Sequence, residues 1–501
     1  MLRPPSARDL RAIAFYSGNI VVWFGVLMLI PIGIGLVERE WQPVLDFATG
    51  MGLCLAAGFG LQLFWKGPPP ALSGTAGLVS AAVSWLVCLV AGAIPYYLTG
   101  YYLTFLDALF DTMSGFTTTG LTLIQDINHL PDSVNTWRMF ISWLGGQGMV
   151  VLALSFFTRG LPGAYKIYAG EDRDERLLPN VIHTARAVWV VSAAYLMLGT
   201  LMAWLAGLSI GLMPGRAFLH GLWMFMAAFS TGGFAPYGQN LLYYHSFAFE
   251  LVMIVCFVVG SFNFNLHWSL FTGNRQEIRK NLELVTFLIT ATLLVALGTY
   301  GLGQMSVYTN VAGLVRKGFL QLISAHTTTG FMTVYARQLI LEWGPAAMVA
   351  IVIAMMLGGS ASSTAGGFKA FRVGIVFKAL VYDLKRLLLP ESAVTVQKFH
   401  MFRSAVLDDR TARSAMTIIL LYVATVAGTT AMGALAGYDF LPALFEAASV
   451  TSNVGLSAGL TTVATPWFLK VTYILVMWVG RLEFMSVFAL IGYVYAGVRG
   501  R

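Results

Sequence analysis

Four short segments of this chain end in the same chemistry, small or polar residues followed by glycine and then by Leu or Phe. Their letters are TTTGL, STGGF, TTTGF and SNVGL. Glycine adopts backbone dihedrals that other residues avoid, so successive carbonyl oxygens can turn to one side. A ring of such carbonyls replaces the hydration shell of a cation, and the hydroxyls coordinate it or brace the turn. A single TTTG would be an ordinary turn, but four copies predict an ion-selectivity filter.

The predicted filter takes four residues from each copy, and we call these the filter segments. They recur at intervals of roughly 100 residues, and internal repetition of this kind indicates symmetry in the fold. One chain would thus build a pseudo-fourfold filter without oligomerisation. The predicted ion-binding residues are Thr117, Thr118, Thr119, Gly120, Ser230, Thr231, Gly232, Gly233, Thr327, Thr328, Thr329, Gly330, Ser452, Asn453, Val454 and Gly455.

A second unusual run, Gly358–Gly367, interrupts an apolar stretch with four glycines and several hydroxyl residues. Each Gly disfavours a helix by about 1 kcal/mol relative to Ala. Broken helices occur in membranes where the backbone faces a cavity. The run therefore predicts a break at such a cavity, and the alternative is a close helix contact made by small residues.

Charged residues inside apolar stretches are the remaining candidates. Arg481 lies within the last stretch, and an ionisable residue at membrane depth is a functional candidate by default. Its structural alternative is an ion pair with Glu483 or Asp111. Asp107, Asp111 and Glu446 precede filter segments; they could concentrate cations or cap helices, and packing against a neighbouring repeat is the preferred role for Asp111. None of the three is predicted to bind the ion.

Each filter segment follows a short apolar or amphipathic stretch and precedes a longer apolar run. We interpret the short stretch as a pore helix that enters the membrane and stops halfway. Its C-terminal carbonyls would be unpaired and partially negative, so four such ends aimed at one axis favour a cation. The non-helical turn that follows is tolerated at membrane depth only where it lines a water-filled path.

The composition excludes an ordinary soluble domain, since 57% of the 501 residues are hydrophobic and 11% are charged. Soluble domains carry roughly 25% charged residues. A span needs about 20 apolar residues, and ten stretches qualify, the eighth of them short. The predicted spans are residues 12–36, 44–65, 75–99, 136–158, 186–212, 246–271, 283–303, 343–358, 414–436 and 466–497.

The net charge of +8 does not indicate nucleic-acid binding, because the Lys and Arg residues fall in loops. Most of them lie in the N-terminal tail, the C-terminus and every second connection. The largest basic connection runs from Lys369 to Arg413. Cytoplasmic loops carry such an excess of positive charge. Both termini are therefore predicted to be cytoplasmic, and the filter segments to lie in outward connections.

The filter segments, the Trp143–Leu154 and Gly358–Arg372 runs and the Gly480–Glu483 tetrapeptide resemble the Trk/Ktr/HKT superfamily of potassium transporters. The resemblance spans nearly the whole chain and is closest to the bacterial TrkH branch, which has an extra N-terminal two-span unit. It aligns the family's filter glycines with Gly120, Gly233, Gly330 and Gly455. Glycine at all four positions favours potassium, because plant relatives with Ser at the first position tend to select sodium. The second and fourth segments, STGGF and SNVGL, depart from the usual family pattern.

The resemblance also implies a gate, namely an intramembrane loop beneath the filter with a fixed positive charge near it. It implies that Arg481 lies just below the filter and that Lys369 anchors the loop; for Lys369 the alternative is a snorkelling interfacial lysine. The gating residues implied are Gly358, Gly359, Ser360, Ser363, Thr364, Gly366, Gly367, Lys369 and Arg481.

The predicted fold is an all-α integral membrane protein in which four parallel repeats of span, pore helix and span surround a pore. An N-terminal two-span unit would occupy residues 1–70, and the repeats residues 71–170, 171–280, 281–408 and 409–501. The predicted function is potassium uptake across the cytoplasmic (inner) membrane. A symporter coupled to protons or sodium remains an alternative, as, more remotely, does a secondary transporter of a larger solute, which usually has inverted repeats.

No enzymatic activity is expected, because neither HExxH nor a Walker A sequence appears. Potassium is the transported ion, and no bound cofactor is expected. The resemblance implies a homodimer docked on a cytosolic ring of TrkA-type regulatory subunits. NAD or ATP would bind that partner rather than this chain.

Overall fold

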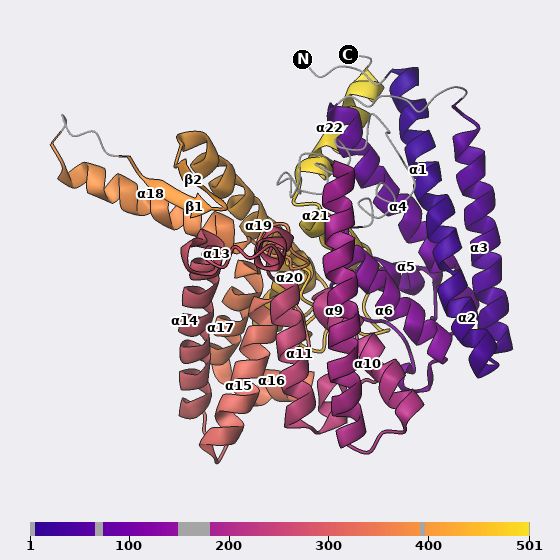
Figure 1. Cartoon of the computed structure of the whole chain (residues 1–501), viewed down its shortest axis with the longest axis horizontal. Helices are drawn as coiled ribbons and strands as arrows, with labels where there is room; N and C mark the ends of the chain where they lie inside the picture. Colours follow the sequence, from indigo (N-terminus) through magenta and orange to yellow (C-terminus); the bar gives the residue numbers. More distant parts are fainter. Residues whose placement is uncertain (1–5, 66–73, 149–180, 391–395, 500–501) are drawn as a thin grey trace.

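The computed structural model describes residues 6–65, 74–148, 181–390 and 396–499. Within these ranges the regular secondary structure consists of helices and one short β-hairpin (Figure 1). Three helices form an N-terminal unit, α1 (Ala7–Leu27), α2 (Leu29–Glu38) and α3 (Trp41–Gln62). The hydroxyl of Ser6 caps α1, and Arg39 in a left-handed conformation ends α2. Gly18 and Gly58 let α1 and α3 approach closely, as small residues do between membrane helices.

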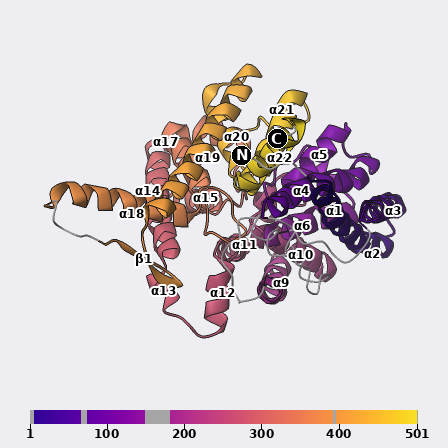
Figure 2. The same cartoon turned by 90° about the horizontal axis from the view of Figure 1, so that it is seen from above.

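Four times the chain then forms a long first helix, a short pore helix and a second helix. The pore helices are α5 (Phe105–Phe116), α10 (Pro214–Phe229), α15 (Val311–His326) and α20 (Phe440–Thr451). The first helices are α4 (Gly74–Leu98), α9 (Val181–Ser209), α14 (Leu282–Gln304) and α19 (Asp409–Leu435). The second helices begin as α6 (Asp132–Gln147), α11 (Phe247–Gly260), α17 (Gly344–Leu357) and α21 (Trp467–Arg481). Figure 2 shows the four groups arranged around the middle of the molecule.

Two of the predicted spans are not straight. Residues 246–271 divide into α11 and α12 (Phe264–Phe271), which meet at 99°, and residues 466–497 divide into α21 and α22 (Met485–Arg499), which meet at 112°. The first break follows because Asn263 caps a new helix through the N–H of Asn265. At the second, Glu483 and Phe484 take positive φ and end α21. Neither break was predicted, because long apolar stretches lie on both sides of the few polar residues at each break.

The other predicted spans agree with the helices as far as the structure describes them. Within the part of the chain that the structure describes, six helices are long and apolar enough to cross a membrane, and counting each bent pair as one span raises the number to eight. The predicted eighth span is α17, which is short and apolar as expected. The predicted fourth span begins in α6, whereas its remainder and the basic connection after it lie outside the described residues.

The basic connection after the third repeat contains more structure than the sequence predicts. Helix α18 (Ala370–Leu388) projects from the body of the molecule, and a hairpin of β1 (Lys398–Met401) and β2 (Arg403–Val406) lies beside it (Figure 1). Short helices α13 (Glu277–Lys280) and α16 (Ala336–Glu342), and 3₁₀ turns at Ile127–His129 and Asn240–Tyr244, complete the described elements.

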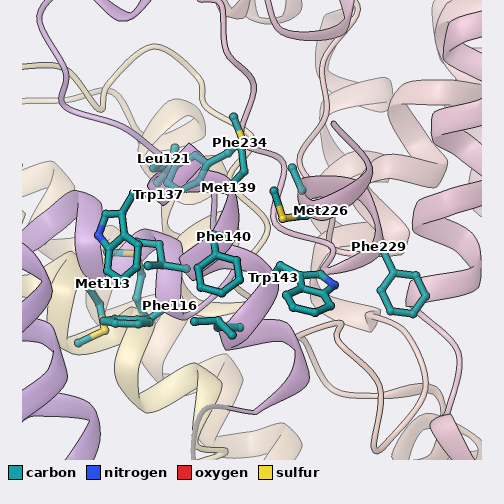
Figure 3. Close-up of a cluster of buried hydrophobic side chains, with 14 of the residues drawn as sticks. Met113, Phe116, Leu121, Trp137, Met139, Phe140, Trp143, Met226, Phe229 and Phe234 are labelled. Carbon is teal, nitrogen blue, oxygen red and sulfur yellow. The ribbon is translucent and has the colours of Figure 1, made fainter. Parts of the chain in front are cut away.

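A cluster of buried aromatic and methionine side chains lies next to the first and second filter segments and includes Phe116 and Phe234, which flank them (Figure 3). Trp137, Phe140 and Trp143 follow one face of α6 at helical spacing, with ring centroids 6.2 and 6.0 Å apart. Phe116 at the end of α5 and Phe234 after the second filter segment join them. This aromatic packing fixes the ends of the pore helices, so the filter segments start from rigid elements.

Candidate ion-conduction site

The four filter segments have the same backbone conformation. The second residue of each is left-handed, with φ of 56° at Thr118, 52° at Thr231, 55° at Thr328 and 55° at Asn453. The fourth residue, always glycine, has φ between 64° and 87°. Such angles are uncommon outside glycine, and four matching copies indicate one shared geometry. Gly233, not Gly232, is the glycine that matches the fourth position of the other segments.

The N–H groups of each filter segment point back to its own pore helix. The first three residues of every segment donate to carbonyls in the last turns of that helix, at 2.8–3.3 Å. In the first segment, Thr119 donates to Ser114 and Thr118 to Gly115. This is a Schellman-type helix end. The expectation of unpaired carbonyls on the helix itself was therefore wrong, and the carbonyls left over belong to the filter segments.

The filter glycines close the segments into a ring. At each of these glycines an added Cβ would overlap the backbone carbonyl of the third residue in the next segment. Only glycine fits so close an approach. The contacts run in order around the molecule and return to the start: Gly120 with Gly232, Gly233 with Thr329, Gly330 with Val454, and Gly455 with Thr119.

The side chains of the filter segments brace one another. The hydroxyls of Thr117 and Thr119 lie 2.8 Å apart, and the same pair recurs in the third segment. Asn453 Nδ2 donates to Thr119 Oγ1 at 3.1 Å and so links the fourth segment to the first. The polar residues of all four segments are buried. Of the two roles considered for the hydroxyls, these contacts correspond to bracing.

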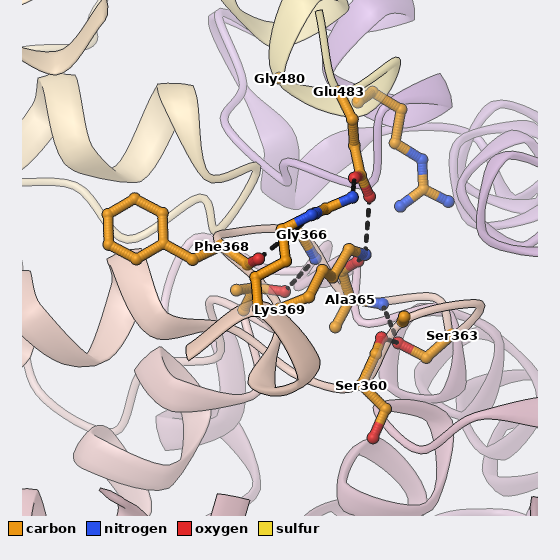
Figure 4. A network of polar contacts seen from close by, with 12 residues as sticks. Ser360, Ser363, Ala365, Gly366, Phe368, Lys369, Gly480 and Glu483 are labelled. Carbon is orange, nitrogen blue, oxygen red and sulfur yellow. Dashed lines mark hydrogen bonds and ion pairs between the residues drawn. The ribbon is translucent and has the colours of Figure 1, made fainter. Parts of the chain in front are cut away.

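The run Gly358–Lys369 forms an irregular loop beneath the filter segments, between α17 and α18 (Figure 4). The Thr364 hydroxyl lies 3.0 Å from the carbonyl oxygen of Phe229 and 2.8 Å from that of Gly260. The N–H of Gly366 donates to the hydroxyl of filter residue Thr328 at 2.7 Å. The Thr364 hydroxyl also lies 3.3 Å from that of filter residue Thr231, so the loop contacts two filter segments directly. The run is therefore a loop and not a close helix contact of small residues.

Two basic side chains hold this loop. Arg481 donates to the carbonyl of Thr364 at 2.6 Å and to that of Gly145 at 2.7 Å, which joins the loop to two second helices. Lys369 is buried, donates to the carbonyl of Ala365 and lies 3.7 Å from Glu483. Lys369 is thus not a snorkelling interfacial lysine. Glu483 also pairs with Arg372, a contact that the sequence argument did not predict.

The three acidic residues near the filter have separate roles. Asp107 completes a capping box with Thr104 and pairs with Lys470 at 2.6 Å. Asp111 contacts Tyr102, Leu123 and Arg138, all in its own repeat. Packing of Asp111 against a neighbouring repeat was therefore a wrong expectation. Arg138 makes that connection instead, since it lies over the ring of Phe234.

Glu446 is the third acid, and it accepts hydrogen bonds from the irregular segment that follows the fourth filter segment. One of its donors is the hydroxyl of Ser457. Gly455–Gly459 has the letters of the G-x-S-x-G hydrolase pattern, which the argument against an enzyme overlooked. The pattern requires a nucleophile between a strand and a helix, whereas this segment follows α20, so the match does not indicate catalysis.

Three glycines of the second helices also contact the pore helices, although the sequence analysis did not predict a role for them. An added Cβ at Gly145, Gly260 or Gly480 would overlap the last carbonyl of a pore helix, namely that of Phe116, Phe229 or Thr451. In the third repeat, Gly358 has the corresponding position in the sequence, but α17 ends there and an added Cβ would overlap the carbonyl of Gly366 instead. The available signal was an apolar pair followed by glycine about 25 to 28 residues after each filter glycine.

These features define a class of protein: a helical membrane protein in which four similar units of one chain surround a common ring. Comparison with known proteins gives the family. The family model described as TrkH, cation transport protein, matches residues 54–491. The chain therefore belongs to the TrkH family of cation transport proteins and is a multi-pass membrane protein, which confirms the predicted family and fold class.

Individual relatives cover most of the chain. An uncharacterized cation transporter of Methanocaldococcus jannaschii is 32% identical over 490 residues, 97% of this chain and 96% of that one. The Trk system potassium uptake protein TrkH of Escherichia coli K12 is 27% identical, over 77% of this chain and 79% of its own length. The crystal structure of the potassium transporter TrkH from Vibrio parahaemolyticus superimposes with a TM-score of 0.82 at 26% identity, and covers 96% of this chain and 98% of that one.

Proposed function

We propose that this chain carries potassium across the cytoplasmic membrane through the ring of four filter segments. The observation that supports this most directly is the cyclic contact of the four filter glycines with the carbonyls of the next segment. A closed ring of carbonyls is the arrangement that replaces the hydration shell of a monovalent cation. Relatives named as potassium uptake proteins, matched along most of the chain, support potassium as the ion.

The direction of the backbone hydrogen bonds supports the same conclusion. Because the first three N–H groups of each filter segment donate to its pore helix, the polar groups left to those residues for an ion are carbonyls and hydroxyls. These are acceptors, and they suit a cation rather than an anion. Glycine in all four segments keeps the ring free of side chains at its closest point. The proposed ion-binding residues are the sixteen of the filter segments.

We propose further that the loop Gly358–Lys369 is the gate. Its contacts with Thr231 and Thr328 support this role, because they join the loop to two of the filter segments. Arg481 holds it there and adds a fixed positive charge, which opposes passing cations. The gate opens in this proposal when the loop withdraws from the filter segments.

The remaining assignments rest on the sequence pattern and the family. The termini are assigned to the cytoplasm from the distribution of Lys and Arg, and α1 begins at the same end of the molecule at which α22 ends (Figure 1). The chain divides at about residues 70, 170, 280 and 408 into the N-terminal unit and four repeats. A homodimer and a TrkA-type regulatory ring that binds NAD or ATP complete the proposal. The partner would dock on the basic connection around α18.

Rubidium tracer uptake into proteoliposomes that contain the purified chain alone tests the function. Potassium should block uptake, sodium should block it less, and choline should have little effect. Imposing a proton or sodium gradient at constant potassium separates a channel from a symporter. Uptake that no alkali cation inhibits, with or without the regulatory partner, would contradict the proposal.

A further inference from the structure

Two buried carboxylates occupy equivalent positions in the first and fourth pore helices. Asp111 lies six residues before Thr117, the first residue of its filter segment, and Glu446 lies six residues before Ser452. Neither carboxylate is exposed to solvent. The equivalence suggests a common task, and their hydrogen bonds identify it.

Each carboxylate accepts a hydrogen bond from the backbone segment that directly follows its filter segment. The N–H of Leu123 donates to Asp111 Oδ1 at 2.9 Å, and the N–H of Ala458 donates to Glu446 Oε1 at 3.0 Å. Leu123 and Ala458 are each the third residue after a filter glycine. The same backbone N–H is therefore fixed by the same position of the pore helix in both repeats.

Glu446 is enclosed by donors. Besides the N–H of Ala458, it accepts from Ser457 Oγ at 2.6 Å, the N–H of Leu460 at 3.2 Å and Thr461 Oγ1 at 3.1 Å. These four contacts, three to Oε1 and one to Oε2, fix the carboxyl group in one orientation. Among the described residues no Lys or Arg pairs with Glu446, whereas Arg138 Nε lies 3.6 Å from Asp111. Within the described residues, neutral donors alone therefore anchor Glu446 to the segment that follows the fourth filter segment.

The other two repeats lack this arrangement. The equivalent positions hold Met224 and Gln321, and within the described residues the amide of Gln321 has no hydrogen-bond partner. Neutral donors contact the backbone of these two repeats instead. Asn240 Nδ2 donates to the carbonyl of filter residue Gly233 at 3.1 Å, and Ser324 Oγ donates to the carbonyl of Phe331, directly after the third filter segment, at 2.9 Å. The two carboxylates therefore lie in the first and fourth repeats, which meet where Gly455 contacts Thr119.

We propose that Glu446 and Asp111 are positioning residues that set ion selectivity at this junction of the ring, an inference that rests on the proposed function. They hold the backbone segments that follow the fourth and first filter segments, and this fixes the carbonyls of Gly455 and Gly120. The selectivity of a carbonyl ring depends on how many dipoles face the ion and how firmly they are held.

The test compares rubidium uptake by the full-length wild type with that by Glu446→Gln, Glu446→Asp and Asp111→Asn in proteoliposomes. The readout is the ratio of the sodium to the potassium concentration that halves uptake. The ratio should fall about fivefold in Glu446→Gln, which corresponds to about 1 kcal/mol of differential stabilisation. Glu446→Asp keeps a carboxyl group that can accept the same hydrogen bonds, so the ratio should fall less. The control is Glu277→Gln, which alters another buried glutamate, one that pairs with His400 near α13.

Unchanged ratios in both Glu446→Gln and Asp111→Asn would overturn the inference, and so would an equal fall in Glu277→Gln. If Glu446→Gln fails to fold, Ser457→Ala combined with Thr461→Val removes two donors and leaves the carboxylate. A native ratio in that variant overturns the inference, and a reduced ratio supports it. A wild type without uptake would contradict the proposed function itself, whereas an active wild type with indifferent variants would overturn the inference alone.

Discussion

Gly120 combines two demands that a larger residue cannot meet together. Its φ is +87°, and a Cβ there would overlap the carbonyl of Gly232 in the next filter segment. In Gly120→Ser the added atoms must displace that carbonyl, so the ring loses its match to the larger ion. We expect the potassium preference over sodium to fall at least about tenfold, or about 1.4 kcal/mol. Competition of both ions against rubidium uptake measures the change.

Gly100 provides the matched control for this substitution. Its φ of +75° is similar, yet no atom lies within 4 Å of an added Cβ. Gly100→Ser therefore carries the same backbone strain without the steric contact, and it should keep the native ion preference. Equal preferences in the wild type and Gly120→Ser would count against the ring as the selective element.

Arg481 acts through its two carbonyl contacts and through its charge. Arg481→Ala frees the carbonyls of Thr364 and Gly145 and removes a positive charge beneath the filter segments. We expect unstimulated rubidium uptake to rise by at least about tenfold, since one or two charged hydrogen bonds worth about 1.5–3 kcal/mol each are lost from the closed state. The exposed residue Arg413 on α19 is the control for charge removal.

Arg481→Lys separates the two contributions of Arg481. Lysine retains the charge but cannot reproduce the planar fork that reaches two carbonyls. Its uptake should lie between that of the wild type and that of Arg481→Ala. A well-folded Arg481→Ala protein with native uptake would refute the gating role, and a collapse in yield would indicate a structural one.

At the scale of elements, the loop between α17 and α18 depends on Thr364. Its hydroxyl contacts the carbonyls of Phe229 and Gly260 and lies 3.3 Å from the hydroxyl of filter residue Thr231. Thr364→Val keeps the shape and removes these hydrogen bonds, so the loop should leave the filter more readily. We expect a rise in unstimulated uptake of about fivefold, from the loss of about 1 kcal/mol per net hydrogen bond.

Thr292→Val is the comparison for Thr364→Val, because the hydroxyl of Thr292 bonds only to its own helix, at the carbonyl of Leu288. This exposed residue of α14 should tolerate the change with native uptake. Lower uptake in Thr364→Val than in Thr292→Val would mean that the hydroxyl supports the open path, and would contradict the loop as a gate.

The sequence revealed some elements better than others. The pore helices and the loop at Gly358 were predictable, because each is marked by a local change from apolar residues to Gly, Ser and Thr. The breaks after Gly260 and Arg481 were not, since apolar residues continue on both sides of them. Pairing of Lys369 and Arg372 with Glu483 was equally hidden, because residues more than 100 positions apart meet only in the fold.

At the scale of the whole molecule, four copies of a motif imply a ring but do not give the contacts within it. The repetition of TTTG-like segments predicted the pseudo-fourfold plan, which needs only that similar sequences fold alike. The placement of Gly455 against Thr119 and the link from Asn453 to Thr119 follow from packing between distant repeats. Such contacts have no local sequence signal, and this is why the sequence predicted the filter residues but not the braces behind them.

One carboxylate of the N-terminal unit accepts several hydrogen bonds from the first repeat, beside the helix packing that joins the two. Glu40, between α2 and α3, accepts the N–H groups of Asp132 and Ser133 at 2.6 and 3.0 Å and the Ser133 hydroxyl at 2.5 Å. It thus caps the N-terminus of α6, the helix that carries the aromatic residues behind the ring. A carboxylate is favoured there because helix N-termini are partially positive.

Glu40→Gln keeps the size of the side chain and removes its charge, so charge-assisted hydrogen bonds to the start of α6 become neutral and one oxygen becomes a donor that faces other donors. We expect a loss of stability of about 1–3 kcal/mol, seen as a lower midpoint of thermal unfolding in detergent, while the sodium-to-potassium ratio in rubidium uptake stays native. Glu38→Gln, two residues earlier and exposed, should leave both quantities unchanged. If Glu40→Gln altered ion preference at native stability, the N-terminal unit would be part of the conduction machinery rather than a support for it. If neither quantity changed, the capping contact would not hold the unit in place.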